Sequence, residues 1–329
     1  MTVNFSLLDQ VRHACQSVAE RASYVGIDRD RLLAFARFLL SDSSYPLDSL
    51  DHPVHDPNCH YLRHGADTAA FFLTLDTINF GSGYSPHLRK RPGMSGYFTM
   101  ASSLNDHYRA FGPLSADELV QLDAQGCAAI FGQDLSMPPA RELMGLFCTA
   151  LNDLGRLVRD RYAGRFVGLV EAAETSAERL IRLLTEMPYF RDVSSYAGFE
   201  VPLFKRAQIA AADLALAFGG QGYGRFEDLD RLTIFADNLV PHVLRVEGVL
   251  SYDKELLASI NAGELVPAGS PQEVEIRACG LHAVELLVAE LDRLGRKVTA
   301  RELDYVLWNR GQGRRFKSQP RHRTRTVYY

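Results

Sequence analysis

The sequence has little of what marks secreted or membrane proteins. Its five cysteines are scattered over 329 residues and none forms a C-x-x-C pair, which is typical of reduced thiols rather than of a disulfide framework. The most apolar window, AQIAAADLALAF, is about 12 residues long and contains an aspartate, so it is too short to cross a bilayer. The N-terminal stretch has no basic segment followed by a sustained apolar one. We therefore expect a cytoplasmic protein without a signal peptide.

Several signatures of cofactor-binding and repeat proteins are also absent. The chain has no G-x-G-x-x-G motif, no internal repeat and no low-complexity linker. Its net charge is −4, but the last 20 residues contain seven Lys and Arg and no acid. The other 309 residues hold 29 basic and 40 acidic residues, a balance of −11. Such a basic end favours an anionic partner, or a tail that packs on its own acidic body.

Helical signals dominate what is present, and they predict an all-α protein. Capping boxes, in which Ser or Thr precedes Glu by three residues, begin helices at Ser115 and Thr299. Further helices are expected over 136–162, 174–187, 201–222, 251–264 and 270–295. The stretch 69–84 fits a strand or a buried helix, because periodicity cannot decide between them. We expect a single helical domain over residues 1–329, with a weaker boundary near residue 112.

The stretch TIFADNLVPHVLR, residues 233–245, places Asp237 between two apolar runs. A carboxylate is seldom fully buried unless its charge is satisfied. One explanation is an N-cap, in which Asp237 accepts hydrogen bonds from the first N–H groups of a helix. The other is a catalytic carboxylate in a pocket. The two explanations are compatible.

A Pro-rich segment over residues 51–64 is dense in groups that bind metals. It contains His52, His55, Asp56, Cys59, His60 and His64. Their spacing fits no standard zinc pattern, so we favour histidines that form local hydrogen bonds or contact a ligand, and we expect no metal.

The segment LDTINFGSGY combines Asp76, Asn79, Phe80 and Tyr84 with a glycine turn. An amide that donates and accepts, next to an aromatic ring, suits the recognition of a flat heterocycle. The alternative is a helix end, with Asn79 near the C-cap and Phe80 in the core.

Two cations, Lys205 and Arg206, stand where a helix is expected to begin, and Asp213 follows within the same apolar run. Cations are disfavoured at that end of the helix dipole, so a bound phosphate would explain them. The alternative is a pair of solvated charges. Asp213 is either paired in the interior or part of a site.

Two further groups of aromatic residues lie near the C-terminus. Tyr305 and Trp308 share one helix face, either as ligand contacts or as a core-facing pair. The tail mixes arginines with Phe316, Tyr328 and Tyr329, which is typical of single-strand binding or of a tail folded onto an acidic body.

Six motifs in order give the chain a specific resemblance. LDTINF, FKRAQIAAADL, FEDLDRLTIFADNLVPHVL, QEVEIRAC, LDYVLWNRG and HRTRTVYY resemble the queuosine salvage protein family from about residue 60 to the C-terminus. The resemblance implies a queuosine 5′-phosphate N-glycosylase that releases queuine, a 7-deazaguanine base, for reuse in tRNA. It also implies an all-helical fold similar to helix-hairpin-helix DNA glycosylases.

The resemblance also implies roles for individual residues. Asp237 corresponds to the catalytic carboxylate. Our own hypothesis for Asp213 is that it activates the water or orients Asp237, and the alternative is a structural role. We expect a small-molecule substrate, bound by Asp76, Asn79, Phe80, Tyr84, Lys205, Arg206, His52, Tyr305 and Trp308. No cofactor is required and no membrane or nucleic-acid partner is expected. The family usually has a Trp-containing segment where this chain has NFGSGY, so Phe80 or Tyr84 would replace its stacking.

Two other functions remain open at this point. The first is a glycosylase acting on a modified base within a polynucleotide, which the basic tail favours and the acidic body opposes. The second is a non-catalytic nucleotide- or RNA-binding module.

Overall fold

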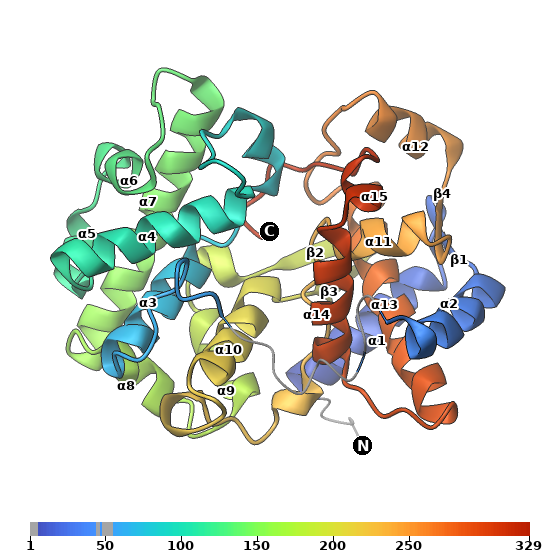
Figure 1. Ribbon diagram of the computed structural model, residues 1–329, viewed down its shortest axis with the longest axis horizontal. Helices are drawn as coiled ribbons and strands as arrows, with labels where there is room; N and C mark the ends of the chain where they lie inside the picture. The colour runs from blue at the N-terminus through green and yellow to red at the C-terminus, as the bar shows by residue number, and fades with distance from the viewer. Residues whose placement is uncertain (1–5, 44–46, 48–54) are drawn as a thin grey trace. The chain divides into compact units, whose positions relative to one another are not determined.

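A computed structural model describes residues 6–43, 47 and 55–329, and its elements are mainly α-helices (Figure 1). The chain divides into two compact units, each assembled from separate segments. Unit 1 comprises residues 1–53, 192–205 and 230–325, and unit 2 comprises 54–191, 206–229 and 326–329. Residue 112 lies within unit 2. The predicted all-α class is confirmed, and the single domain stays a prediction.

Unit 1 combines helices with two short antiparallel strand pairs. Strand β1 pairs with β4, and β2 pairs with β3. The helices of this unit are α1 (Leu7–Ala19), α2 (Arg29–Ser41), α11 (Val240–Val246), α12 (Lys254–Asn261), α13 (Pro271–Arg293), α14 (Ala300–Gly311) and α15 (Arg314–Lys317). The strands are β1 (Val25–Ile27), β2 (Val193–Tyr196), β3 (Phe199–Pro202) and β4 (Leu250–Tyr252).

The regular elements of unit 2 are all helices among its described residues. Its α-helices are α3 (Ala66–Thr77), α4 (Gly96–Phe111), α5 (Ala116–Gln121), α6 (Ala124–Phe131), α7 (Pro138–Tyr162), α8 (Phe166–Glu171) and α9 (Ala177–Leu184). Its 3-10 helices are η2 (Ser82–His87), η3 (Pro188–Phe190) and η4 (Gly222–Gly224). Two elements continue from one unit into the other, α10 (Lys205–Ala217) and η5 (Leu229–Arg231).

Helix starts follow the capping signals in most places. Both capping boxes are confirmed, with Ser115 bonded to Glu118 and Thr299 to Glu302. Ser270 also caps α13 as expected. The prediction that Ser136 begins a helix is wrong, because α7 has Met137 at its N-cap without a side-chain bond. The undecided stretch 69–84 contains the end of α3, whose residues from Thr68 to Thr77 are all buried.

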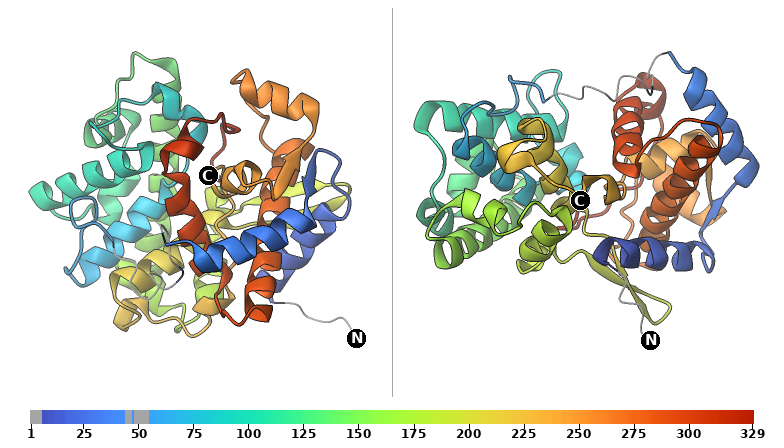
Figure 2. Two further views of the ribbon diagram at one scale, coloured as in Figure 1. Left: turned by 45° about the vertical axis from the view of Figure 1, so that its right-hand side comes forward. Right: turned by 90° about the horizontal axis from the view of Figure 1, so that it is seen from below.

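The predicted helix over 201–222 begins later than expected. Residues 199–202 form β3, which pairs with β2 in a hairpin (Figure 2). Val193 faces Pro202 and Tyr196 faces Phe199. Ala197 and Gly198 turn the hairpin with positive φ values of 48° and 84°, as a two-residue turn requires. Helix α10 therefore begins only at Lys205.

Helix α11 packs against both α13 and α14 within unit 1 (Figure 1). Two glycines allow this close approach. A Cβ on Gly280 of α13 would lie 2.9 Å from Pro241, and a Cβ on Gly311 of α14 would lie 2.8 Å from Leu239. These contacts fix the start of α11, which follows Asp237, between two buried helices.

None of the helices in the described ranges combines the length and the apolar character needed to cross a bilayer.

Candidate active site

Asp237 caps the start of α11 while staying half-buried. Its Oδ1 accepts a hydrogen bond from the Leu239 N–H at 2.7 Å and another from the Val240 N–H at 3.2 Å. These bonds satisfy N–H groups that the first turn of a helix leaves free. The hydrogen bonds of the capping explanation are therefore present, although the N-cap position of α11 is Leu239, two residues later. The same bonds hold the carboxylate in one orientation, which a catalytic group requires.

A second carboxyl group, Asp304 of α14, faces the same segment of chain. Its Oδ1 accepts the Phe235 N–H at 3.0 Å, two residues before Asp237. Burial raises the pKa of Asp304 well above its ordinary value, and the nearby Asp237 carboxylate adds to the shift. The Phe235 bond and the charge of Lys205 oppose it. Asp237, Asp304 and Lys205 thus form one electrostatic group, in which Asp304 favours its protonated form.

A buried ion pair connects the two chain segments that carry Lys205 and Asp237. Arg277 of α13 donates Nη1 and Nη2 to the two carboxylate oxygens of Asp192, at 2.9 and 2.7 Å. Its Nε donates to the Ala236 carbonyl at 2.9 Å. Asp192 Oδ2 in turn accepts the Lys205 backbone N–H at 3.1 Å. One fully buried guanidinium therefore fixes both positions.

The start of α10 shows backbone strain beside Lys205. Phe204 has a φ of 49°, a conformation that costs energy for a residue with a side chain. The Leu203 N–H, directly after β3, donates to the Asp192 carbonyl at 2.9 Å and fixes the end of the hairpin. Lys205 is 5% exposed, so its charge is directed into the interior rather than to bulk solvent.

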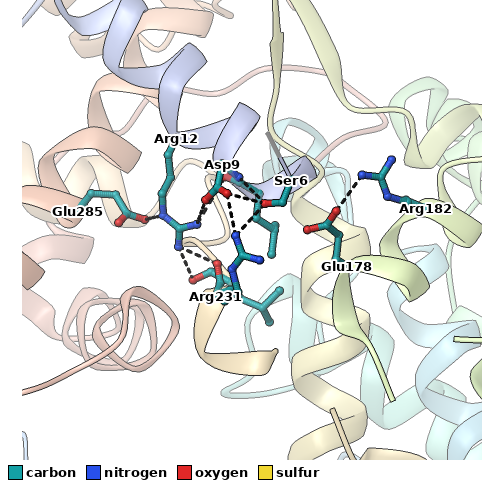
Figure 3. A network of polar contacts seen from close by, with 9 residues as sticks. Ser6, Asp9, Arg12, Glu178, Arg182, Arg231 and Glu285 are labelled. Carbon is teal, nitrogen blue, oxygen red and sulfur yellow. Dashed lines mark hydrogen bonds and ion pairs between the residues drawn. The ribbon is translucent and has the colours of Figure 1, made fainter. Parts of the chain in front are cut away.

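A surface network fixes the chain that leads to Asp237 (Figure 3). Arg12 of α1 donates to the Arg231 carbonyl at 2.7 Å and pairs with Glu285 of α13 at 3.1 Å. Arg231 donates to Asp9 and to Ser6, each at 2.8 Å. Both ends of the segment 231–239 are thus held by helices of unit 1.

The predicted base-recognition residues Asp76, Asn79 and Phe80 lie together in unit 2. Asn79 follows the C-terminus of α3, and its Nδ2 donates to Asp76 Oδ1 at 3.5 Å. Phe80 is 8% exposed and packs edge-on against Phe147 at 5.1 Å. The helix-end alternative is therefore confirmed for Phe80, while Asn79 is half-buried.

Arg206 is the most enclosed cation of unit 2. Its guanidinium donates to the carbonyls of Asp76, Thr77 and Tyr189. It also lies 4.8 Å from the ring centre of Phe80 and 4.5 Å from that of Phe190. The alternative of two solvated charges is wrong, since Lys205 and Arg206 are both buried. The geometry of Arg206 holds Phe80 and the end of α3 in place.

The NFGSGY turn is fixed by Gly81 and Tyr84. Gly81 has a φ of 99°, and a Cβ there would lie 2.7 Å from Leu143, so only glycine fits. Its N–H donates to the Tyr329 carbonyl at 3.0 Å. Tyr84 is buried and its hydroxyl donates to Glu142 at 2.8 Å. The segment NFGSGY therefore forms a tight turn.

The histidine segment forms local hydrogen bonds, as favoured. His60 contacts the Asp56 carbonyl at 3.0 Å and the Tyr97 hydroxyl at 3.1 Å. His55 contacts the Asp213 carbonyl at 3.2 Å. Burial lowers the pKa of both histidines to about 4. Asp213 is half-buried, and its Oδ1 lies 3.9 Å from His55 Nε2, so both explanations for Asp213 stay open. No cluster of three or more metal-binding side chains occurs among the described residues.

His52 lies outside the residues that the structure describes. Two other predicted ligand contacts, Tyr305 and Trp308, lie on α14 with Asp304. The core-pair alternative is wrong for Tyr305, which is 37% exposed, and Trp308 is half-buried.

The folded-tail alternative is confirmed by Arg315, which pairs with Glu247 at 3.1 Å.

Sequence reasoning missed Asp304, Asp192 and Arg277 as parts of the site. Asp304 carried the strongest signal, since an aspartate in the middle of an amphipathic helix needs a partner. Asp192 and Arg277 are separated by 85 residues, and nothing in the sequence links them.

The helical fold and this group of carboxyls fit the class of N-glycosyl hydrolases. A carboxylate that is fixed by backbone N–H groups can stabilise a cationic transition state. The family model of the queuosine salvage protein matches residues 59–329, and the chain belongs to that family.

Relatives from distant organisms match most of the chain. A queuosine 5′-phosphate N-glycosylase/hydrolase of Sphaerobacter thermophilus is 35% identical over 317 residues, covering 95% of each chain. Proteins of the same name from Bos taurus and Dictyostelium discoideum are 31% and 33% identical. The Bos taurus match covers 97% of this chain and 98% of that protein, and the Dictyostelium match covers 80% and 78%.

Proposed function

We propose that this protein hydrolyses the N-glycosidic bond of queuosine 5′-phosphate and releases queuine. The observation that carries the proposal is Asp237, a half-buried carboxylate fixed by two backbone N–H groups beside a second carboxyl and a buried lysine. The shared name of the relatives supports the same substrate.

Asp237 supplies the charge that the reaction needs. Breaking the bond from C1′ to nitrogen develops positive charge on the ribose. A carboxylate below C1′ stabilises this charge or attacks the carbon, and water completes the hydrolysis. The hydrogen bonds from the start of α11 engage Oδ1 of Asp237 and keep the carboxylate oriented. Asp213 stays our candidate for activating the water.

Asp304 and Lys205 adjust the charge around Asp237. A neutral Asp304 avoids a second negative charge beside the first, and can donate a hydrogen bond. Lys205 is a buried cation that acts on Asp304. We assign it to substrate binding near the ribose. The 7-deaza base lacks the ring nitrogen that a purine would protonate on leaving, so hydrogen bonds to its edge must stabilise it.

The remaining substrate contacts stay proposals from the sequence. Asp76 and Asn79 suit the edge of the base, with Phe80 and Tyr84 as aromatic neighbours. His52, Tyr305, Trp308 and Arg206 complete the proposed contacts. We also propose a backbone arrangement similar to helix-hairpin-helix glycosylases, a single domain and a cytoplasmic location.

The test is to incubate the purified protein with queuosine 5′-monophosphate and to follow base release by chromatography and mass. Queuine is the expected product, together with ribose 5-phosphate. A correctly folded protein that binds the nucleotide but releases no base would overturn the proposal and favour a binding module.

A further inference from the structure

The hairpin of β2 and β3 is attached to α13 at both of its ends. Near the turn, the Tyr196 hydroxyl donates to Glu275 of α13 at 2.8 Å. At the open end, Asp192 lies directly before β2, and its two carboxylate oxygens accept Nη1 and Nη2 of Arg277. One helix of unit 1 therefore fixes the place where the chain enters and leaves the hairpin.

Asp192 also binds three consecutive N–H groups on the far side of the hairpin. Its carbonyl accepts the N–H groups of Leu203 at 2.9 Å and of Phe204 at 3.4 Å. Its Oδ2 accepts the Lys205 N–H at 3.1 Å. A single residue thus determines the backbone path from the end of β3 to the first residue of α10.

This path includes the strained backbone of Phe204, whose φ is 49°. A residue with a side chain keeps such a conformation only where the surrounding structure imposes it, and such residues gather at functional sites. Here the hydrogen bonds of Asp192 lie on the residues before and after Phe204. The strained turn leads directly into Lys205, which is buried. The turn therefore gives the Lys205 side chain its direction into the interior.

The partner of Asp192 reaches the chain beside Asp237 as well. Arg277 Nε donates to the Ala236 carbonyl at 2.9 Å, while the other nitrogens of the same guanidinium bind Asp192. The donors of a guanidinium have a fixed planar geometry. One carboxylate and one guanidinium therefore set the separation between the backbone of Lys205 and that of Asp237.

Stability alone does not explain a buried ion pair at this place. Asp192 is 2% exposed and Arg277 is fully enclosed. Taking two charges out of water is costly, and apolar side chains of similar volume often give equal or greater stability. The contacts of this pair join two segments that carry proposed active-site groups, which is the task of residues that support a site.

We propose that Asp192 is a positioning residue of the active site and acts on the reaction through Lys205. Its role rests on the proposed function, in which Lys205 binds the substrate near the ribose. By fixing the start of α10, Asp192 places the ammonium group against the developing transition state. A misplacement of about 1 Å can cost about 10²-fold in rate. Both oxygens of Asp192 are bound to Arg277 and to the Lys205 N–H, so Asp192 itself is not a catalytic residue.

The experiment compares Asp192→Asn with Glu273→Gln as its matched control. Glu273 is buried on α13, lies 3.6 Å from Arg277, and accepts the Gly269 N–H, outside the segments that carry Lys205 and Asp237. Each variant removes one carboxylate charge beside the same guanidinium. For base release from queuosine 5′-monophosphate, we expect Asp192→Asn to lower kcat by about 10- to 100-fold. Glu273→Gln should match the wild type, and an equal loss of kcat in both variants would overturn the proposal.

A double-mutant cycle separates positioning of Lys205 from a general loss of structure. Lys205→Met has no ammonium group to place, so Asp192→Asn should lower kcat far less in that background than in the wild type. The same fold loss in both backgrounds would mean a merely structural role and would overturn the proposal. Asp192→Glu keeps the charge and moves the carboxylate by one methylene, and it enters the cycle if circular dichroism shows that Asp192→Asn is unfolded.

A spectroscopic readout judges the role of Asp192 without turnover, so failure of the proposed function is distinguishable. In that case the wild type releases no base. Lysine labelled with ¹³C at Cε gives a resonance for Lys205, assigned by its absence in Lys205→Met. Asp192→Asn should shift this resonance in the free protein, and Glu273→Gln should leave it in place. An unmoved resonance in Asp192→Asn would overturn the positioning role, whatever the wild type does with the nucleotide.

Discussion

Lys205 and Arg206 are neighbours in the sequence, yet they belong to two regions with different chemistry. In unit 1, Lys205 is part of a group of charges that act on one another, together with Asp237 and Asp304. In unit 2, Arg206 is bonded to neutral carbonyls and lies against two aromatic rings. The difference shows that burial of a charge alone does not mark a catalytic group. What matters is whether its partners are other titratable groups or the backbone.

The largest expected effect compares Arg277 with Arg206. Removing Arg277 leaves Asp192 and Glu273 buried without their cation, so Arg277→Met should lower the free energy of unfolding by about 3–5 kcal/mol. Arg206→Met removes the bonds to the carbonyls of Asp76, Thr77 and Tyr189 and should cost less, about 1–3 kcal/mol. Urea unfolding followed by circular dichroism measures both. Equal losses of unfolding free energy in the two variants would contradict the difference between Arg277 and Arg206.

Asp237→Asn is the next largest change, and it affects rate rather than stability. The amide oxygen can still accept the Leu239 and Val240 N–H groups, so the cap is kept while the charge is lost. We expect kcat to fall by about 10²–10³-fold, the scale for removing one positioned electrostatic group. Single-turnover base release measures it.

The control for Asp237 is a carboxylate with the same structural task in unit 2. Asp228 accepts the Ala177 and Glu178 N–H groups at the start of α9. Asp228→Asn should therefore keep the wild-type kcat. A near wild-type rate for Asp237→Asn, or a large loss for Asp228→Asn, would remove Asp237 from the catalytic role.

The sequence predicts local features of this protein well, because they depend on residues close in the chain. The capping boxes at Ser115 and Thr299 and the cap by Asp237 each need only three or four residues. The start of α10 was mispredicted because β3 is stabilised by pairing with β2, a contact that local propensity does not describe.

The site shows the same limit more strongly. Asp237 was found because a carboxylate interrupts an apolar run, and the family motif pointed to the same residue. The ion pair that positions it joins Asp192 to Arg277 across 85 residues, and Asp304 reaches Phe235 across 69. Such partners become visible only when the fold brings α13 and α14 against the start of α11.

Acid should destabilise both units through buried neutral histidines. His242 of α11 accepts from Arg245 at Nδ1 and contacts the Phe316 carbonyl through Nε2, which requires the neutral form with a proton on Nε2. Burial lowers the pKa of His242 to about 4, and that of His60 in unit 2 also to about 4. Because the folded pKa is below the ordinary value of 6.5, this stability is present above pH 6.5 and is lost as the pH falls toward 4.

The measurement is the free energy of unfolding between pH 7 and pH 4. Each such histidine adds a slope of up to about 1.4 kcal/mol per pH unit in this window. His242→Gln and His60→Gln should each lower the slope of the unfolding free energy against pH by the contribution of one proton. An unchanged slope in either variant would show that its histidine is not held neutral in that unit.

The smallest expected effect compares two capping boxes, one in each unit. Thr299 caps α14 through the Glu302 N–H at 3.2 Å, and Ser115 caps α5 through the Glu118 N–H, also at 3.2 Å. Thr299→Ala and Ser115→Ala should each lower the free energy of unfolding by about 1 kcal/mol, since each removes one cap of the same kind. Their effects on activity should differ, because α14 carries Asp304 one turn after the cap and α5 carries none of the proposed catalytic groups. A frayed α14 loosens the bond between Asp304 and the Phe235 N–H. We therefore expect Thr299→Ala to reduce kcat by a few-fold and Ser115→Ala to leave kcat unchanged.

The contradicting outcome is equal kcat values in the two variants at equal loss of stability. It would show that the position of Asp304 does not limit the reaction.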